Sequence, residues 1–429
     1  MYRYVSKLLI YRNIGRDSIL FRLADVTRDM DSGSYDKDEI CSRILDEIHS
    51  LLLLATDYGF DHNIWHSYIA YLLAMTENPF TLCTEKRGAV EGTVNQLVMN
   101  DFRSFKAIMD YDFSRIEKEL SINYFSLLKD YNAVRKEEER YNVNVSLRIR
   151  ELQSAIGRSK NAEELFDAAM DFYKKYGVGS FGMNKAFRVD NTGLLVPIMT
   201  TSDVTFDGLV GYERQKQELI GNTEAFVSGK PANNVLLYGD AGTGKSTSVK
   251  ALLNMFYDDG LRIIEVYKHD FKLLPEIISK IKGRNYRFII YMDDLSFESI
   301  ETEFKYLKAV IEGDMEVRPA NVLIYATSNR RHLIHETFSD RGDGGDDIHK
   351  NETVAERMSL SARFGLTIGY FRPERMEYYE IVKKLVDKRI QDEMTEEELL
   401  ARADVWALRH GGMSGRVAKQ FADSFEADH

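Results

Sequence analysis

The chain has 429 residues, of which 44% are hydrophobic and 29% charged, and its formal net charge is −11. This length predicts two or three domains with sizeable cores, and the acidic balance argues against a surface that binds nucleic acid over its whole extent. Only two cysteines occur, Cys41 and Cys83, so a disulfide framework and a cysteine-based metal site are both disfavoured and a reducing compartment is expected.

The N-terminus shows no secretory signal, because it lacks an apolar core followed by small residues. The longest apolar stretch lies near residues 51–55 and is far shorter than the roughly 20 residues that cross a bilayer. We therefore expect a cytoplasmic protein with no membrane partner.

The first 190 residues are predicted to form a helical domain. Only Pro79 falls within the first 196 residues, and long helices exclude proline from their interior. Apolar side chains between Ile40 and Ala55 recur at steps of three and four, which places them on one face of a helix. We interpret such faces as core packing, since burial is the usual role of an apolar stripe.

The character of the sequence changes where glycines and a turn-rich stretch lead to Pro197. From Val235 onward, short runs of branched apolar residues alternate with helical patterns, as in buried parallel strands connected by helices. Residues 191–370 are thus expected to form an α/β domain with a doubly wound parallel sheet. After Pro373 the pattern is helical again, and residues 371–429 are expected to form a separate helical lid.

Residues 239–246 read GDAGTGKS, a complete match to G-x-x-x-x-G-K-[ST]. A strand-like run precedes this loop and a helical pattern follows it, which is the context that the phosphate-binding motif requires. Its glycines let backbone N–H groups wrap a phosphate at the positive end of the helix. Lys245 is expected to reach the β- and γ-phosphates of ATP, and Ser246 to ligate Mg²⁺. The nucleotide contacts predicted for this loop are Gly239, Asp240, Ala241, Gly242, Thr243, Gly244, Lys245, Ser246 and Thr247.

Two adjacent carboxylates end the apolar run at residues 288–295, FIIYMDDL. The carboxyl ends of strands in an open α/β sheet face the crevice in which ligands bind. Asp293 is predicted to hold Mg²⁺ through the water shell of the ion, and Asp294 to orient or deprotonate the attacking water. An acidic strand end that faces solvent is the alternative interpretation.

Three further polar positions follow in chain order. Asn329 ends the run NVLIYATSN and is predicted to hydrogen-bond the γ-phosphate or the attacking water, with Thr327 and Ser328 as lesser candidates. Arg363 precedes another strand-like run, and we expect it to stabilise transition-state charge in a neighbouring subunit's site. Arg416 begins a helix of the predicted lid, within reach of the nucleotide. For each arginine, a solvated surface position is the alternative.

These elements, in this order, resemble those of the AAA+ ATPases. The sequence GDAGTGKS is similar to Walker A, MDD to Walker B, ATSN to sensor 1, SARFG to the arginine-finger box and SGR to sensor 2. The segment FDGLVGYERQKQEL, residues 206–219, resembles the stretch that contacts adenine, and Val210 and Gly211 are the implied contacts. The resemblance covers about residues 204–425. The sequence of this range looks closest to that of the bacterial domain of unknown function 815 ATPases, which pair a helical N-terminal region with an AAA+ module.

Two features depart from the AAA+ pattern. Walker B usually pairs Asp with Glu, whereas here Asp294 follows Asp293, and the shorter side chain is expected to slow hydrolysis or prolong the ATP-bound state. No aromatic-apolar-glycine pore loop lies between the strand-like runs RIIEVYK and FIIYMDD. This second departure argues against an unfoldase that threads its substrate, and brings the module nearer to initiator, loader or switch types by analogy.

The resemblance implies an ATP hydrolase that works as a homo-oligomer, expected to be a ring. It would couple ATP binding and hydrolysis at intersubunit sites to the remodelling or loading of a macromolecular partner. We expect an unidentified protein partner to be recognised by the helical domain of residues 1–190. The main alternative is a slowly hydrolysing, ATP-gated assembly or binding protein that acts as a switch on protein or DNA. A DNA-linked role has no direct residue support, and a P-loop small-molecule kinase is disfavoured because the arginine and lid elements follow the AAA+ order.

Overall fold

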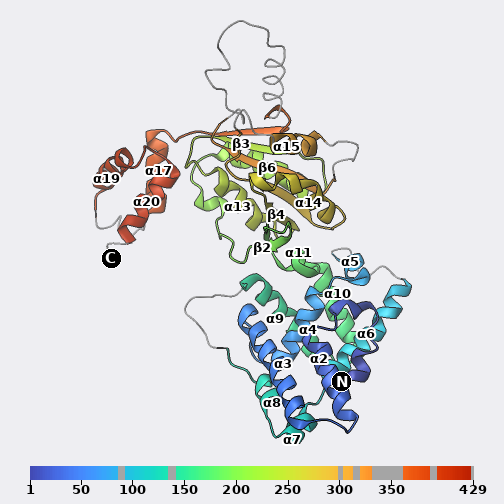
Figure 1. Cartoon of the computed structure of the whole chain (residues 1–429). Helices are drawn as coiled ribbons and strands as arrows, with labels where there is room; N and C mark the ends of the chain where they lie inside the picture. The colour runs from blue at the N-terminus through green and yellow to red at the C-terminus, as the bar shows by residue number, and fades with distance from the viewer. Residues whose placement is uncertain are drawn as a thin grey trace. The chain divides into compact units, whose positions relative to one another are not determined.

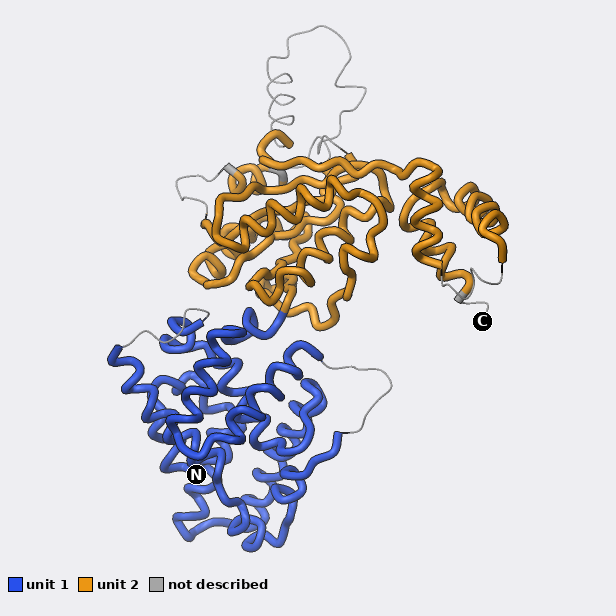
Figure 2. Tube along the Cα trace, turned by 180° about the vertical axis from the view of Figure 1, so that it is seen from behind, with its two compact units in different colours: residues 1–184 blue, residues 185–429 orange. Residues whose placement is uncertain are grey.

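The computed structural model divides the chain into two compact units, Met1–Asn184 and Lys185–His429 (Figures 1 and 2). It describes residues 1–85, 92–133, 142–297, 303–312, 319–330, 361–386 and 394–426. Within these residues, no helix combines the length and the apolar character that a membrane crossing requires. The predicted three-part division, with limits at residues 190 and 370, stays a prediction.

The first unit is built from helices around one hydrophobic core. This confirms the all-α character predicted for the N-terminal region, which precedes the first strand at Ala186. Its elements are α1 Tyr2–Val5, η1 Ile10–Ile14, α2 Ile19–Asp31, α3 Lys37–Tyr58, α4 Ile64–Met75, α5 Pro79–Thr84, α6 Thr93–Met109, α7 Ser114–Leu120, α8 Tyr124–Lys129, α9 Val143–Gly157, α10 Ala162–Tyr176 and α11 Gly179–Met183.

Helix α3 shows how local sequence sets these boundaries. The carboxylate of Asp36 accepts the backbone N–H groups of Asp38 and Glu39, which caps the first turn. Gly59 ends the helix in the left-handed conformation, at φ 61°. The face predicted from the spacing of apolar residues is buried, at Ile40, Ile44, Ile48, Leu51 and Ala55.

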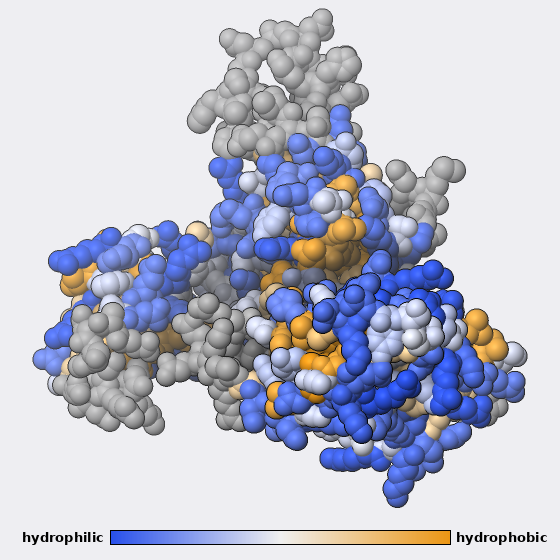
Figure 3. All heavy atoms as spheres, turned by 60° about the horizontal axis from the view of Figure 1, so that its bottom comes forward, coloured by the Kyte–Doolittle hydropathy of each residue, from blue (hydrophilic) through white to orange (hydrophobic). Residues whose placement is uncertain are grey.

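On the face drawn in Figure 3, hydrophilic side chains dominate and the hydrophobic ones form small separate patches. This distribution is expected when the apolar faces of helices and sheet are packed inside.

The second unit is organised by a seven-stranded sheet in the order β2-β1-β4-β5-β6-β3-β7. All neighbouring strands are parallel except β1 and β2, which confirms the predicted α/β class. The strands are β1 Ala186–Val189, β2 Leu195–Pro197, β3 Val235–Gly239, β4 Leu261–Glu265, β5 Arg287–Met292, β6 Val322–Ser328 and β7 Leu366–Tyr370.

Helical segments connect these strands and cover the sheet. Alternate strand residues, such as Val235 and Leu237, pack with α12 and α13 in one core cluster. Leu236 lies between them on the opposite face and is also buried, as expected for a strand covered on both sides. The helices are η2 Phe206–Gly208, α12 Glu213–Val227, α13 Lys245–Phe256, η3 Lys268–Leu273, α14 Leu274–Ile281 and α15 Glu303–Glu312.

The C-terminal helices α17 Arg375–Leu385, α19 Glu396–Arg409 and α20 Gly415–Glu426 form the helical lid predicted after Pro373. They have a hydrophobic cluster of their own, separate from the core of the sheet. Tyr378, Val382, Ala403 and Ala418 are fully buried in it. The lid therefore packs as a small body that the segment after β7 joins to the sheet.

Candidate functional site

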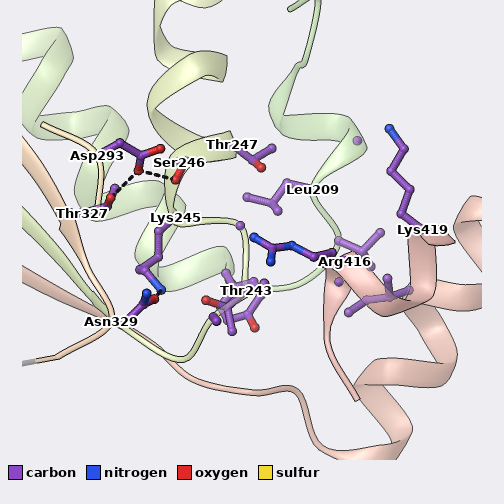
Figure 4. A pocket seen from close by; sticks show the side chains of 18 of the residues that line it. Leu209, Thr243, Lys245, Ser246, Thr247, Asp293, Thr327, Asn329, Arg416 and Lys419 are labelled. Carbon is purple, nitrogen blue, oxygen red and sulfur yellow. Dashed lines mark hydrogen bonds between the residues drawn. The ribbon is translucent and has the colours of Figure 1, made fainter. Parts of the chain in front are cut away.

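A cavity of about 580 Å³ opens beside the carboxyl ends of β3, β5 and β6 (Figure 4). The described residues that line it come from three regions: the segment before α12, the loop between β3 and α13 with the ends of β5 and β6, and the lid. They are Gly208, Leu209, Val210, Tyr212, Ala241, Gly242, Thr243, Gly244, Lys245, Ser246, Thr247, Asp293, Asp294, Thr327, Asn329, Ile381, Leu385, Gly415, Arg416 and Lys419.

The loop between β3 and α13 depends on three glycines with positive φ. Gly239, Gly242 and Gly244 have φ values of 127°, 77° and 93°, a region that other residues rarely adopt. A Cβ on Gly239 would lie 1.9 Å from the carbonyl oxygen of Tyr370, so this position also requires glycine because β7 passes so close. The loop thereby turns its backbone toward the cavity at the N-terminus of α13, which favours anions.

Lys245 is buried at the start of α13. Its ammonium donates to the carbonyl oxygens of Gly239 at 2.8 Å and Asp240 at 2.6 Å, and to Oδ1 of Asn329 at 3.1 Å (Figure 4). Burial lowers the pKa of Lys245, while nearby carboxylates, including Asp294, oppose that shift. The geometry holds the ammonium over the loop, where it can contact phosphate oxygens.

Asp293 collects three hydroxyl groups on one carboxylate oxygen. Its Oδ1 accepts from Ser246 Oγ at 2.7 Å, from the Tyr291 hydroxyl at 2.7 Å and from Thr327 Oγ1 at 2.5 Å. Desolvation works to raise the pKa of Asp293, but these hydrogen bonds outweigh it and hold the pKa below its usual value. The carboxylate is therefore ionised at neutral pH.

Ser246 and Asp293 offer side-chain oxygens that fit a magnesium ion. A hydroxyl and an ionised carboxylate are hard oxygen donors, which Mg²⁺ prefers. The two oxygens already lie 2.7 Å apart at the cavity wall, and they come from the loop and from the strand end that the sequence predicted to meet.

Asp294 and Asn329 are brought together in the cavity. The side-chain amide of Asn329 donates to Asp294 Oδ1 at 2.8 Å, and its Oδ1 accepts from Lys245. The backbone of Asp294 has a positive φ of 52°, which is uncommon for a residue with a side chain and least so for Asp and Asn. The structure thus places two of the three predicted catalytic residues in contact with each other, and one of them, Asn329, in contact with the lysine of the loop.

Thr327 does more here than the sequence indicated. It was a lesser candidate for the role of Asn329, yet its hydroxyl donates to Asp293 and accepts the backbone N–H of Asp294 at 2.9 Å. One side chain on β6 therefore fixes both aspartates at the end of β5. The feature of the sequence that indicates a role for Thr327 is its position at the end of an apolar strand, where polar residues face the crevice.

The lid reaches the phosphate loop at the start of α20. The backbone N–H of Arg416 donates to the carbonyl oxygen of Gly242 at 3.1 Å, and the Arg416 side chain lies over the loop (Figure 4). Lys419, Ile381 and Leu385 add further lid side chains to the cavity wall. Arg416 was predicted to lie here, whereas the other three required the tertiary structure to be found.

Replacing Gly242 with alanine is expected to displace the lid from the loop. A Cβ at this position would lie 3.1 Å from both the Cβ of Arg416 and Oγ of Ser414, and the positive φ adds strain of about 1–2 kcal/mol. We expect thermal stability to fall and the affinity for ATP to drop about tenfold, which is roughly 1.4 kcal/mol. Thermal unfolding and calorimetric titration with ATP measure the two effects.

Gly411→Ala is the matched control for that substitution. Gly411 has a φ of 91°, but nothing lies within 4 Å of the Cβ it would carry. It should therefore lower thermal stability to a similar degree and leave ATP affinity unchanged. Equal losses of ATP affinity in both variants would mean that strain, rather than the contact with Arg416, limits binding.

The segment that joins β7 to the lid is held by two residues of the site region. The Tyr212 hydroxyl donates to the carbonyl oxygen of Phe371 at 2.6 Å, and Asp240 Oδ2 accepts the backbone N–H of Arg372 at 2.9 Å. One anchor lies on the segment before α12 and the other on the phosphate loop. These two hydrogen bonds therefore tie the lid segment to the phosphate loop and to the segment before α12.

Four of the predicted site residues are not among the described residues that line the cavity: Gly211, Gly239, Asp240 and Arg363. Gly239 and Asp240 contribute the carbonyl oxygens that bind Lys245, and Gly211 adjoins the lining residues Val210 and Tyr212. Arg363 differs from these three residues, because it precedes β7 at the end of the strands opposite the phosphate loop.

Arg363 comes just before β7, whose first residue, Leu366, is paired with Val235 at the start of β3. The phosphate loop begins at Gly239, at the other end of β3, about 13 Å further along at 3.3 Å per residue. Arg363 thus lies far from the cavity of its own subunit. A role in another subunit's site agrees with this placement and stays a prediction.

Comparison with known proteins gives one family and several distant structures. The model of the family described as "Protein of unknown function (DUF815)" matches residues 182–429. The Thermotoga maritima RuvB Holliday junction branch migration motor is 15% identical with a TM-score of 0.35, and the match covers 52% of this chain and 64% of that chain. The FIGL-1 AAA domain in complex with ADP is 17% identical with a TM-score of 0.33, over 52% of this chain and 73% of that chain.

The present chain spans less than two thirds of the RuvB chains that it matches. Similarities of this size support no argument about activity. None of the curated protein sequences matches the chain. The interpretation of the cavity therefore depends on the residues that line it.

Proposed function

Because this chain belongs to the family described as protein of unknown function (DUF815), whose model covers its whole second unit, and because it has an AAA+ type fold, we propose that it binds and hydrolyses ATP. The observation that carries the proposal is the convergence of five predicted residues in one cavity. Hydrogen bonds join Lys245, Asn329 and Asp294 on one side and Ser246 and Asp293 on the other. The Thr327 hydroxyl links the two sets.

Each of these side chains has a distinct role under this proposal. Lys245 binds the β- and γ-phosphates beside the backbone N–H groups of the loop. Ser246 and Asp293 would hold Mg²⁺, which neutralises phosphate charge when bound. Asp294 orients the attacking water and accepts its proton, and Asn329 holds the carboxylate of Asp294 in place.

Two arginines and an apolar wall complete the proposed site. Arg416 brings positive charge from the lid, and Arg363 would act on the nucleotide of an adjacent subunit. Leu209 and Val210 face the same cavity as Ile381 and Leu385 of the lid. These four side chains offer an apolar slot for the adenine base, as is usual for the flat part of a ligand.

We further propose that the protein acts as a homo-oligomer, with a ring as the expected form, in the cytoplasm. The ATP cycle would couple to the remodelling or loading of a macromolecular partner. The helical first unit would recognise that partner, which we expect to be a protein. Support for this part comes from the AAA+ pattern and from the position of Arg363 outside its own cavity.

An ATP-gated switch that hydrolyses slowly is the second candidate function. One observation favours it: Asp294 has a shorter side chain than the glutamate usual in AAA+ proteins, and its carboxylate is already bound by Asn329 at 2.8 Å. A carboxylate on the shorter side chain reaches less far toward the attacking water and activates it less effectively. Such a protein would use ATP binding alone to assemble on its partner.

Steady-state phosphate release from ATP tests the main proposal and separates the two candidates. We expect release that requires Mg²⁺ and that falls by about 10²- to 10⁴-fold in Asp294→Asn, since the amide cannot accept a proton. ATP binding should persist in that variant, so it should also retain the partner in pull-down experiments.

The other outcomes of this assay are equally specific. ATP binding without phosphate release in the unmodified protein, together with ATP-dependent assembly, would favour the switch. Phosphate found on an acceptor other than water would revive the small-molecule kinase. Full release in Asp294→Asn would remove Asp294 from the proposed catalytic role.

A further inference from the structure

Tyr291 is a polar residue in an otherwise apolar part of β5. Its neighbours in the strand, Ile289, Ile290 and Met292, are buried, and Tyr291 itself is only 3% exposed. Burial of a phenol hydroxyl costs free energy unless the hydroxyl is hydrogen-bonded. Phenylalanine or isoleucine would fill such a position without that cost. A tyrosine here therefore indicates that the hydrogen bond of its hydroxyl has a function.

The hydroxyl of Tyr291 donates to Asp293 Oδ1 at 2.7 Å. The two residues are two apart in sequence, with Tyr291 next to the last residue of β5 and Asp293 directly after the strand. Ser246 and Thr327 donate to the same oxygen. Of these three donors, Ser246 is the one whose oxygen would itself bind the metal, and Thr327 also holds the backbone of Asp294.

We infer that Tyr291 is a positioning residue for Mg²⁺ binding: its hydroxyl fixes the carboxylate of Asp293 in the orientation that the ion needs. This inference rests on the proposed nucleotide-binding function and adds to it a residue of the run FIIYMDDL to which the motif assigns no role. Hydrogen bonds from a surrounding layer of side chains commonly orient metal-binding carboxylates, and their loss lowers metal affinity. Tyr291 acts through Asp293 and touches neither nucleotide nor metal.

Tyr291→Phe tests this role, since it removes one oxygen and keeps the ring. The full-length protein would be titrated with Mg²⁺ while the binding of fluorescently labelled ADP is followed. We expect the half-saturating Mg²⁺ concentration to rise about tenfold. Binding of the same nucleotide in EDTA should be equal in the variant and the unmodified protein, because Lys245 and the loop are unchanged.

Tyr325→Phe is the matched control in the adjacent strand. Tyr325 is paired with Tyr291 in the register of β5 and β6 and is also buried, but its hydroxyl is bonded to Asn222 and Thr223 on α12. This variant loses a buried hydroxyl of the same sheet and should keep the Mg²⁺ dependence of the unmodified protein. Thermal unfolding of both variants shows that each is folded.

Two results would overturn the inference while leaving the proposed function intact. One is an unchanged Mg²⁺ dependence in Tyr291→Phe, and the other is an equal shift in Tyr325→Phe, which would show a general effect on the sheet. Failure of the unmodified protein to bind labelled ADP with Mg²⁺ would instead refute the proposed function, and this inference with it.

Discussion

Lys245→Ala is expected to abolish nucleotide binding under ordinary assay conditions. The ammonium is the cation that the structure holds inside the phosphate loop, on the carbonyl oxygens of Gly239 and Asp240. Loss of one member of a buried charge pair costs about 2–5 kcal/mol. That corresponds to roughly a 30- to 4,000-fold rise in the dissociation constant. Calorimetric titration of the purified variant with ATP measures it directly.

Lys250→Ala is a suitable control for that experiment. Lys250 lies on the same helix, α13, but is exposed and does not line the cavity. It should bind ATP as the unmodified protein does. Normal ATP affinity in Lys245→Ala, by contrast, would show that the nucleotide binds somewhere other than this cavity.

Arg363→Ala is expected to keep ATP binding and lose turnover. Arg363 is not among the described residues that line the cavity, so the affinity of each subunit for ATP should not depend on it. An arginine supplied to a phosphoryl-transfer site from a neighbouring subunit contributes about 10³- to 10⁵-fold to kcat. Phosphate release and ATP affinity should be measured on the same preparation, with the oligomeric state followed by analytical ultracentrifugation.

Arg214→Ala controls for the loss of an arginine as such. Arg214 is a highly exposed residue of α12 that pairs with Glu218 one turn away, a contact that contributes little to stability. Its removal should leave turnover unchanged. If turnover persists in an Arg363→Ala protein that still assembles, the residue that completes the neighbour's site must be another one.

Local sequence was sufficient for the phosphate loop and for the central strands. The loop motif spans eight consecutive residues, and strands such as β3 and β6 begin with continuous runs of buried apolar residues. The sequence pattern does not predict strands β1 and β2, whose residues lie in the turn-rich stretch that leads to Pro197. Both are short, and β1 exists as a strand because it pairs with the edge of β4, which is information from distant sequence.

The same distinction separates the predicted site residues from those that were missed. Asp293 and Asp294 stand out because charged residues rarely follow an apolar strand without a role. The function of Thr327 depends on how β5 and β6 are aligned, with Met292 opposite Ala326. That alignment brings the Thr327 hydroxyl to both aspartates, and a linear sequence does not contain it.

The placement of Arg363 and the phosphate loop at opposite ends of β3 and β7 constrains the symmetry of an assembly. If Arg363 completes a neighbour's site, each subunit offers two different surfaces, one near the start of β7 and one near Gly239. An interface between unlike surfaces is heterologous and has a direction around the assembly. Such contacts close into a cyclic ring or extend into a helical filament, so a twofold dimer is not the expected functional unit.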